Sequence, residues 1–127
     1  MTMPVQYNFR RRISDLRHEM QRQKVDAFIS SSLSTMRYLC GFYGSHGLLI
    51  VTNLKTYFLT DFRYEEIVQT EVSADIKIVA QGSLSSAASE KKIFSSVKHI
   101  AFEKDRFGNE QSRLLSADTA ATQQAPV

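Results

Sequence analysis

The chain has 127 residues, a mass of 14.5 kDa and a formal net charge of +3 at pH 7. This length allows one domain with a single hydrophobic core. Its 43% hydrophobic and 23% charged residues are typical of a globular protein rather than a disordered chain. No apolar run approaches the roughly 20 residues of a membrane-spanning helix, and a single cysteine, Cys40, excludes an internal disulfide. We therefore expect a cytoplasmic protein without a membrane partner.

The first half of the chain alternates between helical and strand-like patterns. Apolar residues recur at steps of four, three and four along residues 9–24, which predicts an amphipathic helix. Residues 25–30 are rich in β-branched and aromatic side chains and predict a strand. Residues 33–40 return to helical spacing, and Gly41 ends that helix. Residues 47–52 are apolar without alternation, which is typical of a strand covered on both faces.

The second half continues the alternation. A two-residue link joins residues 47–52 to a strand at residues 55–60, and so short a link predicts an antiparallel hairpin. Residues 117–127 have no apolar periodicity and are predicted to be a tail or the start of a linker, after a domain of residues 1–116. The other predicted elements are a helix capped by Thr60 or Asp61, a strand at 75–80, a helix opened by Gly82-Ser83 and ending near residue 97, a strand at 99–103 and a helical turn at 111–115.

The order of these elements predicts the fold class. Helices alternate with strands around one antiparallel hairpin, which indicates an α/β fold with three α/β/α layers. We expect a mixed sheet of about five strands with helices on both faces. Right-handed crossovers should join the parallel neighbours.

Few residues predict chemistry within this chain. The histidines His18, His46 and His99 lie far apart and fit no metal-binding spacing. Cys40 is on the apolar side of its predicted helix, which favours a buried side chain over a thiolate paired with His46. The basic block at residues 10–12 is shorter than the stripe typical of nucleic-acid-binding proteins. We predict no catalytic residue, no metal site and no nucleic-acid partner for this chain.

Two segments have compositions that are unusual for a simple scaffold. Residues 38–47 contain three aromatic side chains, three glycines and one histidine, and residues 60–64 lie at a strand-to-helix turn, where α/β sheets often place binding groups. The structural interpretation is a packed loop, with Arg63 paired to Glu66 on the surface. The functional interpretation is that Arg63 binds a carboxylate in a cleft that another domain or subunit completes.

Four short motifs follow one another at residues 12–66, within a longer matching stretch of residues 9–107. They are R-I-x-x-L-R-x-x-M, V-D-A-F-I-S-S, M-R-Y-L-C-G-F-Y-G-S-H-G-L-L-I-V-T and Y-F-L-T-D-F-R-Y-E-E. In this order they resemble the N-terminal domain of the creatinase/prolidase/Xaa-Pro aminopeptidase family. The resemblance implies a ribonuclease H-like α/β/α domain, without nuclease activity, that precedes a "pita-bread" catalytic domain.

The resemblance also implies a function for the whole protein. In the family, the catalytic domain holds two divalent metal ions (manganese, cobalt or zinc) on two Asp, one His and two Glu residues, and it cleaves the bond before proline. None of those ligand motifs occurs in this chain, so the resemblance implies no cofactor and no catalytic residue here. The expected function is a non-catalytic N-terminal domain of a metal-dependent Xaa-Pro peptidase.

In the family, this domain contributes to a homodimer and shapes substrate access to the cleft. Arg63 and Phe62, together with Tyr38 and His46, match the region that faces the cleft, and they are the substrate-adjacent residues that the resemblance implies. The expected partners are the catalytic domain of the same protein, a second copy and proline-containing peptides. The alternative is a peptidase-derived binding module without catalysis, similar to the related domain in the large subunit of the histone chaperone FACT.

Overall fold

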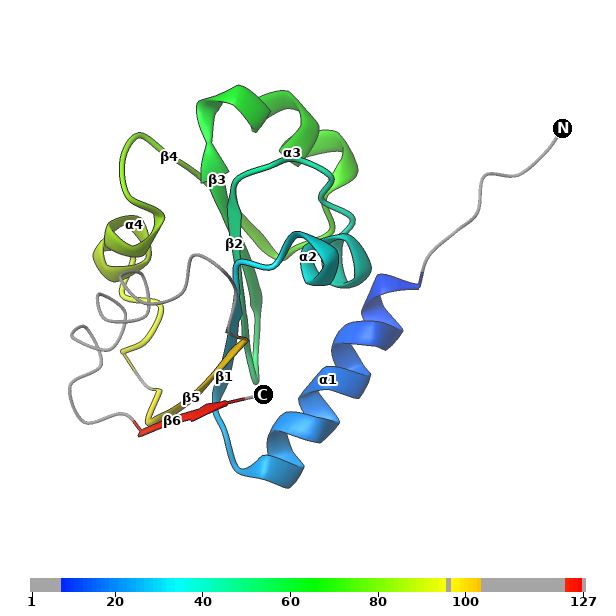
Figure 1. Cartoon of the computed structure of the whole chain (residues 1–127), viewed down its shortest axis with the longest axis vertical. Helices are drawn as coiled ribbons and strands as arrows, with labels where there is room; N and C mark the ends of the chain where they lie inside the picture. The colour runs from blue at the N-terminus through cyan, green and yellow to red at the C-terminus, as the bar shows by residue number, and fades with distance from the viewer. Residues whose placement is uncertain (1–7, 96, 104–122, 127) are drawn as a thin grey trace, which may run out of the picture.

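The computed structural model describes residues 8–95, 97–103 and 123–126, and a mixed sheet runs through its centre (Figure 1). The strands are β1 (Ala27–Ser30), β2 (Gly47–Thr52), β3 (Thr56–Asp61), β4 (Ile76–Ala80), β5 (His99–Glu103) and β6 (Gln123–Pro126). The helices are α1 (Phe9–Gln23), α2 (Leu33–Cys40), the 3₁₀ turn η1 (Phe62–Tyr64), α3 (Glu65–Glu71) and α4 (Leu84–Glu90).

The strand order across the sheet is β4-β3-β2-β1-β5-β6. The strand pairs β1–β2 and β2–β3 are antiparallel, whereas β3–β4, β1–β5 and β5–β6 are parallel. The predicted mixed sheet and its β2–β3 hairpin are therefore confirmed. Strand β1 lies in the middle of the sheet, because β2 and β5 pair with its two edges.

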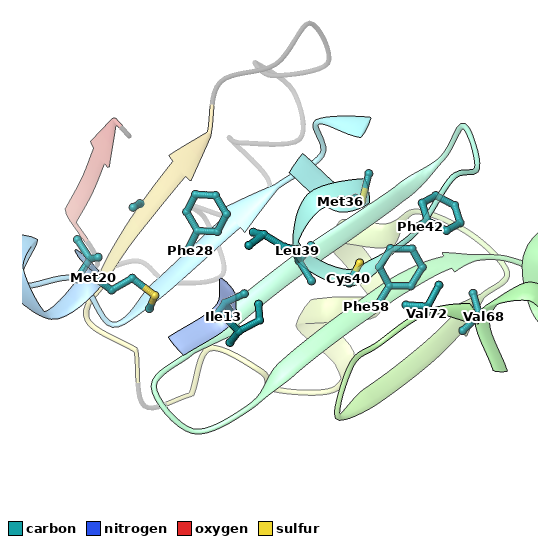
Figure 2. Close-up of a cluster of buried hydrophobic side chains, with 14 residues drawn as sticks. Ile13, Met20, Phe28, Met36, Leu39, Cys40, Phe42, Phe58, Val68 and Val72 are labelled. Atoms are coloured by element: carbon teal, nitrogen blue, oxygen red, sulfur yellow. The ribbon is translucent and has the colours of Figure 1, made fainter. Parts of the chain in front are cut away.

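Each face of the sheet has its own hydrophobic core. Side chains alternate between the two faces along a strand, so Leu49 and Val51 pack with α1, α2 and α3, whereas Leu48 and Ile50 pack with α4. Figure 2 shows the first core, to which α1 contributes Ile13, α2 contributes Met36 and β3 contributes Phe58. The four side chains of residues 48–51 in β2 are fully buried, which confirms a strand covered on both faces and gives the three layers.

Local signals in the sequence explain the ends of α1 and α2. The Asn8 side chain accepts a hydrogen bond from the Arg11 amide and begins α1, and Lys24 ends it with a left-handed φ of 59°. Ser32 caps α2, and Gly41 ends it with a φ of 79°, a conformation that favours glycine. A Cβ on Gly41 would also lie 3.0 Å from the Phe9 ring. Both the left-handed φ and this close contact therefore favour glycine at the end of α2.

Several predicted boundaries are wrong. Helix α4 ends at Glu90 instead of near residue 97, because Lys92 adopts a left-handed φ of 55° and the chain continues in turns. Ile93 and Phe94 are still buried there, so the apolar spacing reports the core rather than a continuous helix. The predicted helix after β3 begins as the 3₁₀ turn η1, and β1 begins at Ala27.

The sheet also has one strand more than expected. β6 lies within the segment that was predicted to be a tail or linker, and it pairs with β5 through its main chain. Main-chain pairing with an edge strand leaves no apolar periodicity in the sequence, which is why the prediction missed it. The predicted helical turn at 111–115 and the proposed domain boundary at residue 116 lie outside the described residues.

Candidate functional site

The two segments that stood out in the sequence meet at one end of the β2–β3 hairpin. Gly47 at the start of β2 pairs with Thr60 near the end of β3, so the loop before β2 lies beside the turn after β3. The Thr60 hydroxyl donates a hydrogen bond to the His46 carbonyl. This bond fixes the loop of residues 41–46 against the turn that begins at Asp61.

Asp61 is the centre of this site. Its Oδ1 accepts from the Arg63 amide at 3.0 Å and from Arg63 Nε at 2.8 Å, and its Oδ2 pairs with Arg63 Nη2 at 2.8 Å. His46 Nδ1 lies 2.8 Å from the same Oδ2. The carboxylate therefore caps η1 and orients both the guanidinium and the imidazole.

The charges of Asp61 and Arg63 stabilise each other. Hydrogen bonds from Arg63 and then from His46 hold the pKa of Asp61 well below its usual range, because each favours the ionised carboxylate. The same contact with Asp61 raises the pKa of Arg63. Arg63 therefore pairs with Asp61, and the sequence-based pairing with Glu66 is wrong.

Aromatic side chains pack against the loop of residues 41–46. The Phe42 ring is fully buried, with its centroid 4.6 Å from that of Phe58 and 5.3 Å from that of Tyr64, where the rings meet edge to face. The Tyr64 hydroxyl accepts from the Ser45 amide at 3.1 Å and lies 2.6 Å from Ser45 Oγ. These hydrogen bonds to Ser45 lower the pKa of Tyr64. A Cβ on Gly44 would lie 2.3 Å from the Phe42 ring, so only glycine fits this turn.

Three of the four predicted site residues share this site. Phe62 follows Asp61 directly and projects into solvent with 71% of its surface exposed. The side chains of Arg63 and His46 are 56% and 42% exposed, so all three can reach a molecule that lies over the turn. The site thus combines an exposed ring, a fixed guanidinium and an imidazole.

Tyr38 belongs to a separate cluster on α2. Its carbonyl accepts from Arg12 Nη1 at 2.7 Å, and its ring lies 4.1 Å from the Arg12 guanidinium. Arg37 lies 5.1 Å from the centroid of the Tyr43 ring. These four side chains and Ser34 line a shallow cavity of about 250 Å³, which we call the arginine–tyrosine cavity. Within the described part of the chain, Tyr38 forms no hydrogen bond or ring contact with Asp61 or Arg63, so it is not part of the Asp61 site.

Comparisons with known proteins agree with this fold. A family model described as the creatinase/prolidase N-terminal domain matches residues 12–126. The chain belongs to the creatinase/prolidase N-terminal domain family. This membership confirms the resemblance that the four sequence motifs indicated, and the match runs through β6.

Individual relatives of this creatinase/prolidase N-terminal domain are peptidases or parts of peptidases. The chain is 30% identical over 94 residues to the uncharacterized peptidase YqhT of Bacillus subtilis (strain 168), over 74% of this chain and 27% of that protein. It is similar to the N-terminal domain of a proposed metallopeptidase from Corynebacterium diphtheriae (TM-score 0.75, 26% identity), over 94% of this chain and 95% of that one. It shares its fold with an Xaa-Pro dipeptidase from Bacillus anthracis (TM-score 0.82, 18% identity), over 94% of this chain and 34% of that one.

This creatinase/prolidase N-terminal domain thus spans about a quarter of the curated relative that it matches. Within the described residues, no helix is both long and apolar enough to cross a bilayer. Among the same residues, no three His, Cys, Asp or Glu side chains gather where they could hold a metal ion. His46 Nδ1 and Asp61 Oδ2 lie 2.8 Å apart, but Asp61 already accepts from Arg63 and no third such side chain joins them among the described residues.

The chemistry that the Asp61 site can perform follows from its hydrogen bonds. A histidine beside a carboxylate can act as a base when a nucleophile lies on its other nitrogen. The His46 ring makes no further hydrogen bond within the described residues, and Ser45 Oγ is held by Tyr64. Cys40 is buried, which raises the pKa of its thiol to about 12. The site can therefore bind and orient an anion or an apolar group, and it holds no activated nucleophile.

Sequence reasoning identified the two segments but missed Asp61 as their centre. The signal was present in the predicted hairpin, because extending its register by one step beyond Gly47 and Thr60 pairs His46 with Asp61. A second network, in which Ser30 Oγ and Thr35 Oγ1 donate to the Glu103 carboxylate, was also missed. It joins the ends of β1 and β5, and no local signal links residues so far apart in the sequence.

Proposed function

We propose that this domain is the non-catalytic N-terminal part of a metal-dependent Xaa-Pro peptidase, in which it shapes substrate access. Support comes first from the family and from relatives described as peptidases. The observation that carries the proposal is the exposed Phe62 beside the fixed Arg63 guanidinium at the end of β3. An apolar ring next to a rigid cation suits one end of a short peptide, with its carboxylate on the guanidinium.

Arg63 can contact a substrate carboxylate without losing Asp61. A guanidinium has five N–H donors, and Asp61 takes the Nε donor and one on Nη2. Nη1 makes no hydrogen bond within the described residues, and the side chain is 56% exposed. Asp61 holds the Arg63 guanidinium in one orientation. Little side-chain entropy is therefore lost when the carboxylate of a peptide binds to that guanidinium.

In this proposal, a second domain of the same protein hydrolyses the bond before proline. A pair of divalent ions (manganese, cobalt or zinc) would supply a Lewis acid and activate water there. The described residues of this chain do not fit such a centre, because no cluster of three ligands occurs among them. Arg63, Phe62 and His46 would instead hold the substrate end over the turn. We further propose a cytoplasmic homodimer, in which this domain roofs the partner's catalytic site.

The test uses the gene as well as the protein. Reading the open reading frame beyond Val127 should show two Asp, one His and two Glu in metal-ligand motifs. The full-length protein should then hydrolyse Xaa-Pro peptides, whereas the 127-residue chain should not. Cleavage by the 127-residue chain alone would refute the division of labour between the domains.

Variants of the full-length protein test the substrate-adjacent residues. Phe62→Ala and Arg63→Met should raise KM for Xaa-Pro peptides. Leu54→Ala is the matched control for the exposed apolar side chain, and Arg22→Met is the control for an exposed ion pair, since Arg22 binds Glu19 on α1. Equal KM values in the test and control variants would show that Phe62 and Arg63 do not contact the substrate.

One observation favours the second candidate function, a peptidase-derived binding module. The arginine–tyrosine cavity offers the Arg37 and Arg12 guanidiniums, each stacked on an exposed tyrosine ring. Arginine and tyrosine are enriched where proteins bind one another. An open reading frame without the five metal ligands would support this function over the peptidase.

A further inference from the structure

We propose that a cavity at the opposite end of β3 binds a small carboxylate with a branched apolar body. The cavity holds about 500 Å³, within the range of ligand pockets in proteins. It lies between α1, Leu54 at the tip of the β2–β3 hairpin and residues 73–75 before β4, and we call it the α1–hairpin cavity. Thr56, which lines it, begins β3, whereas Asp61 ends that strand, so the cavity is separate from the Asp61 site.

Arg17 lines this cavity, and one nitrogen of its guanidinium has no hydrogen-bond partner among the described residues. Arg17 Nε donates to the Thr52 carbonyl at 2.9 Å, which anchors the side chain. Arg17 Nη2 is buried and has no hydrogen-bond partner among the described residues. Arginine keeps its charge at every physiological pH, and a buried donor without a partner is costly and rare. A ligand carboxylate would supply the missing acceptor.

The other charges around the cavity also favour an anion. Arg10 lines the same cavity and makes no ion pair within the described part of the chain. Asp75 is the carboxylate among the lining residues, and its Oδ2 already accepts from the Thr56 amide at 2.8 Å and from Thr56 Oγ1 at 3.1 Å. Two arginines and one aspartate therefore line the cavity, and the aspartate already accepts hydrogen bonds from Thr56.

The apolar part of the lining narrows the class of ligand. Phe9 and Ile13 form one wall, and Leu54 stands at the hairpin tip with 87% of its surface exposed. An exposed leucine beside a cationic cavity leaves apolar surface for a ligand to cover. Inorganic phosphate would gain nothing from these side chains, whereas the carboxyl end of an apolar amino acid would use both the guanidinium and the apolar wall.

N-acetyl-leucine is the probe that tests this proposal. The 127-residue chain is titrated with N-acetyl-leucine, N-acetyl-leucinamide, acetate and inorganic phosphate, and binding is followed by amide chemical shifts. N-acetyl-leucine should shift amides of α1 and the hairpin tip and should bind about tenfold more tightly than the other three probes, which corresponds to about 1.4 kcal/mol. Equal binding of the neutral amide, equal binding of phosphate, or no saturable shift with N-acetyl-leucine would overturn the proposal.

Two variants connect the shifts to the cavity. Arg17→Met keeps the apolar stem and should weaken N-acetyl-leucine binding about tenfold, since it removes the unpaired donor. Arg11→Met is the matched control, because Arg11 lies on the same helix but does not line the cavity. Should Arg17→Met not fold, Leu54→Asp places a negative charge at the exposed tip and should weaken binding to a similar degree. Unchanged binding in Leu54→Asp would refute the site. These binding measurements need no peptidase activity, so they remain decisive whether or not the proposed function holds.

Discussion

Replacing Gly44 by alanine tests the packing that holds the Asp61 site together. The new Cβ would lie 2.3 Å from Phe42 Cζ and 2.7 Å from Tyr64 Cε1, well inside van der Waals contact. Phe42 cannot retreat, because its ring is fully buried against Phe58. The loop must therefore move away from Tyr64, and the hydrogen bonds from Ser45 to the Tyr64 hydroxyl should weaken with it.

The expected loss of stability comes from two contributions. Overpacking of a well-packed site costs roughly 1–3 kcal/mol, and a weakened hydrogen bond between Ser45 and the Tyr64 hydroxyl costs about 0.5–1.5 kcal/mol. We take about 2 kcal/mol as the central value for the decrease in the free energy of unfolding. For a domain of this size, that loss lowers Tm by about 8 °C.

Urea and thermal unfolding, followed by circular dichroism, measure this loss. Gly82→Ala is the matched control, because a Cβ there would meet nothing within 4 Å. It should change the free energy of unfolding by less than about 0.5 kcal/mol. If Gly44→Ala were as stable as Gly82→Ala, the contact between this loop and the two rings would not be part of the folded protein.

Three further predictions follow from the ionisable groups. The Cys40 thiol, whose pKa is raised to about 12 by burial, should react with a thiol reagent only after unfolding in urea, and fast labelling of the native protein would contradict this. Because Arg63 lowers the folded-state pKa of Asp61, the stability advantage of the wild type over Asp61→Asn should be complete above about pH 4 and shrink as the pH falls further. Urea titrations across that range measure it, and a pH-independent difference would refute the pairing. Ser45→Ala should raise the pKa of Tyr64, since Ser45 lowers it, and tyrosinate absorbance compared with Tyr64→Phe should show the rise.

Local signals were sufficient to predict most of the elements. Helix α2 has the predicted bounds because its cap Ser32 and its terminator Gly41 act on their own neighbours. Strand β2 also has the predicted bounds, since an unbroken apolar run next to a two-residue link leaves few alternatives. The predicted helix beyond Glu90 was wrong because buried side chains in turns can mimic helical spacing, as Ile93 and Phe94 do.

Features that depend on the order of strands were not predictable from one sequence. Nothing local indicates that β5 pairs with β1, yet this pairing brings Glu103 to the Ser30 and Thr35 hydroxyls. The strand β6 was missed for the same reason, since it exists through pairing with β5. The Asp61–His46 contact was predictable in principle, because the register of the predicted hairpin places these two residues opposite each other.

The two ends of β3 differ in whether the chain itself satisfies their hydrogen-bonding groups. At one end, both Asp61 oxygens accept bonds from Arg63, and His46 adds another to Oδ2. This network is satisfied within the chain, so it rigidifies the turn and presents Phe62, and removing Asp61 should cost stability. At the other end, Arg17 Nη2 is buried without a partner, so its charge is a cost in the free protein that a bound carboxylate would relieve. A carboxylate that binds there should therefore stabilise the fold, whereas one that binds at Arg63 meets a cation that Asp61 has already compensated.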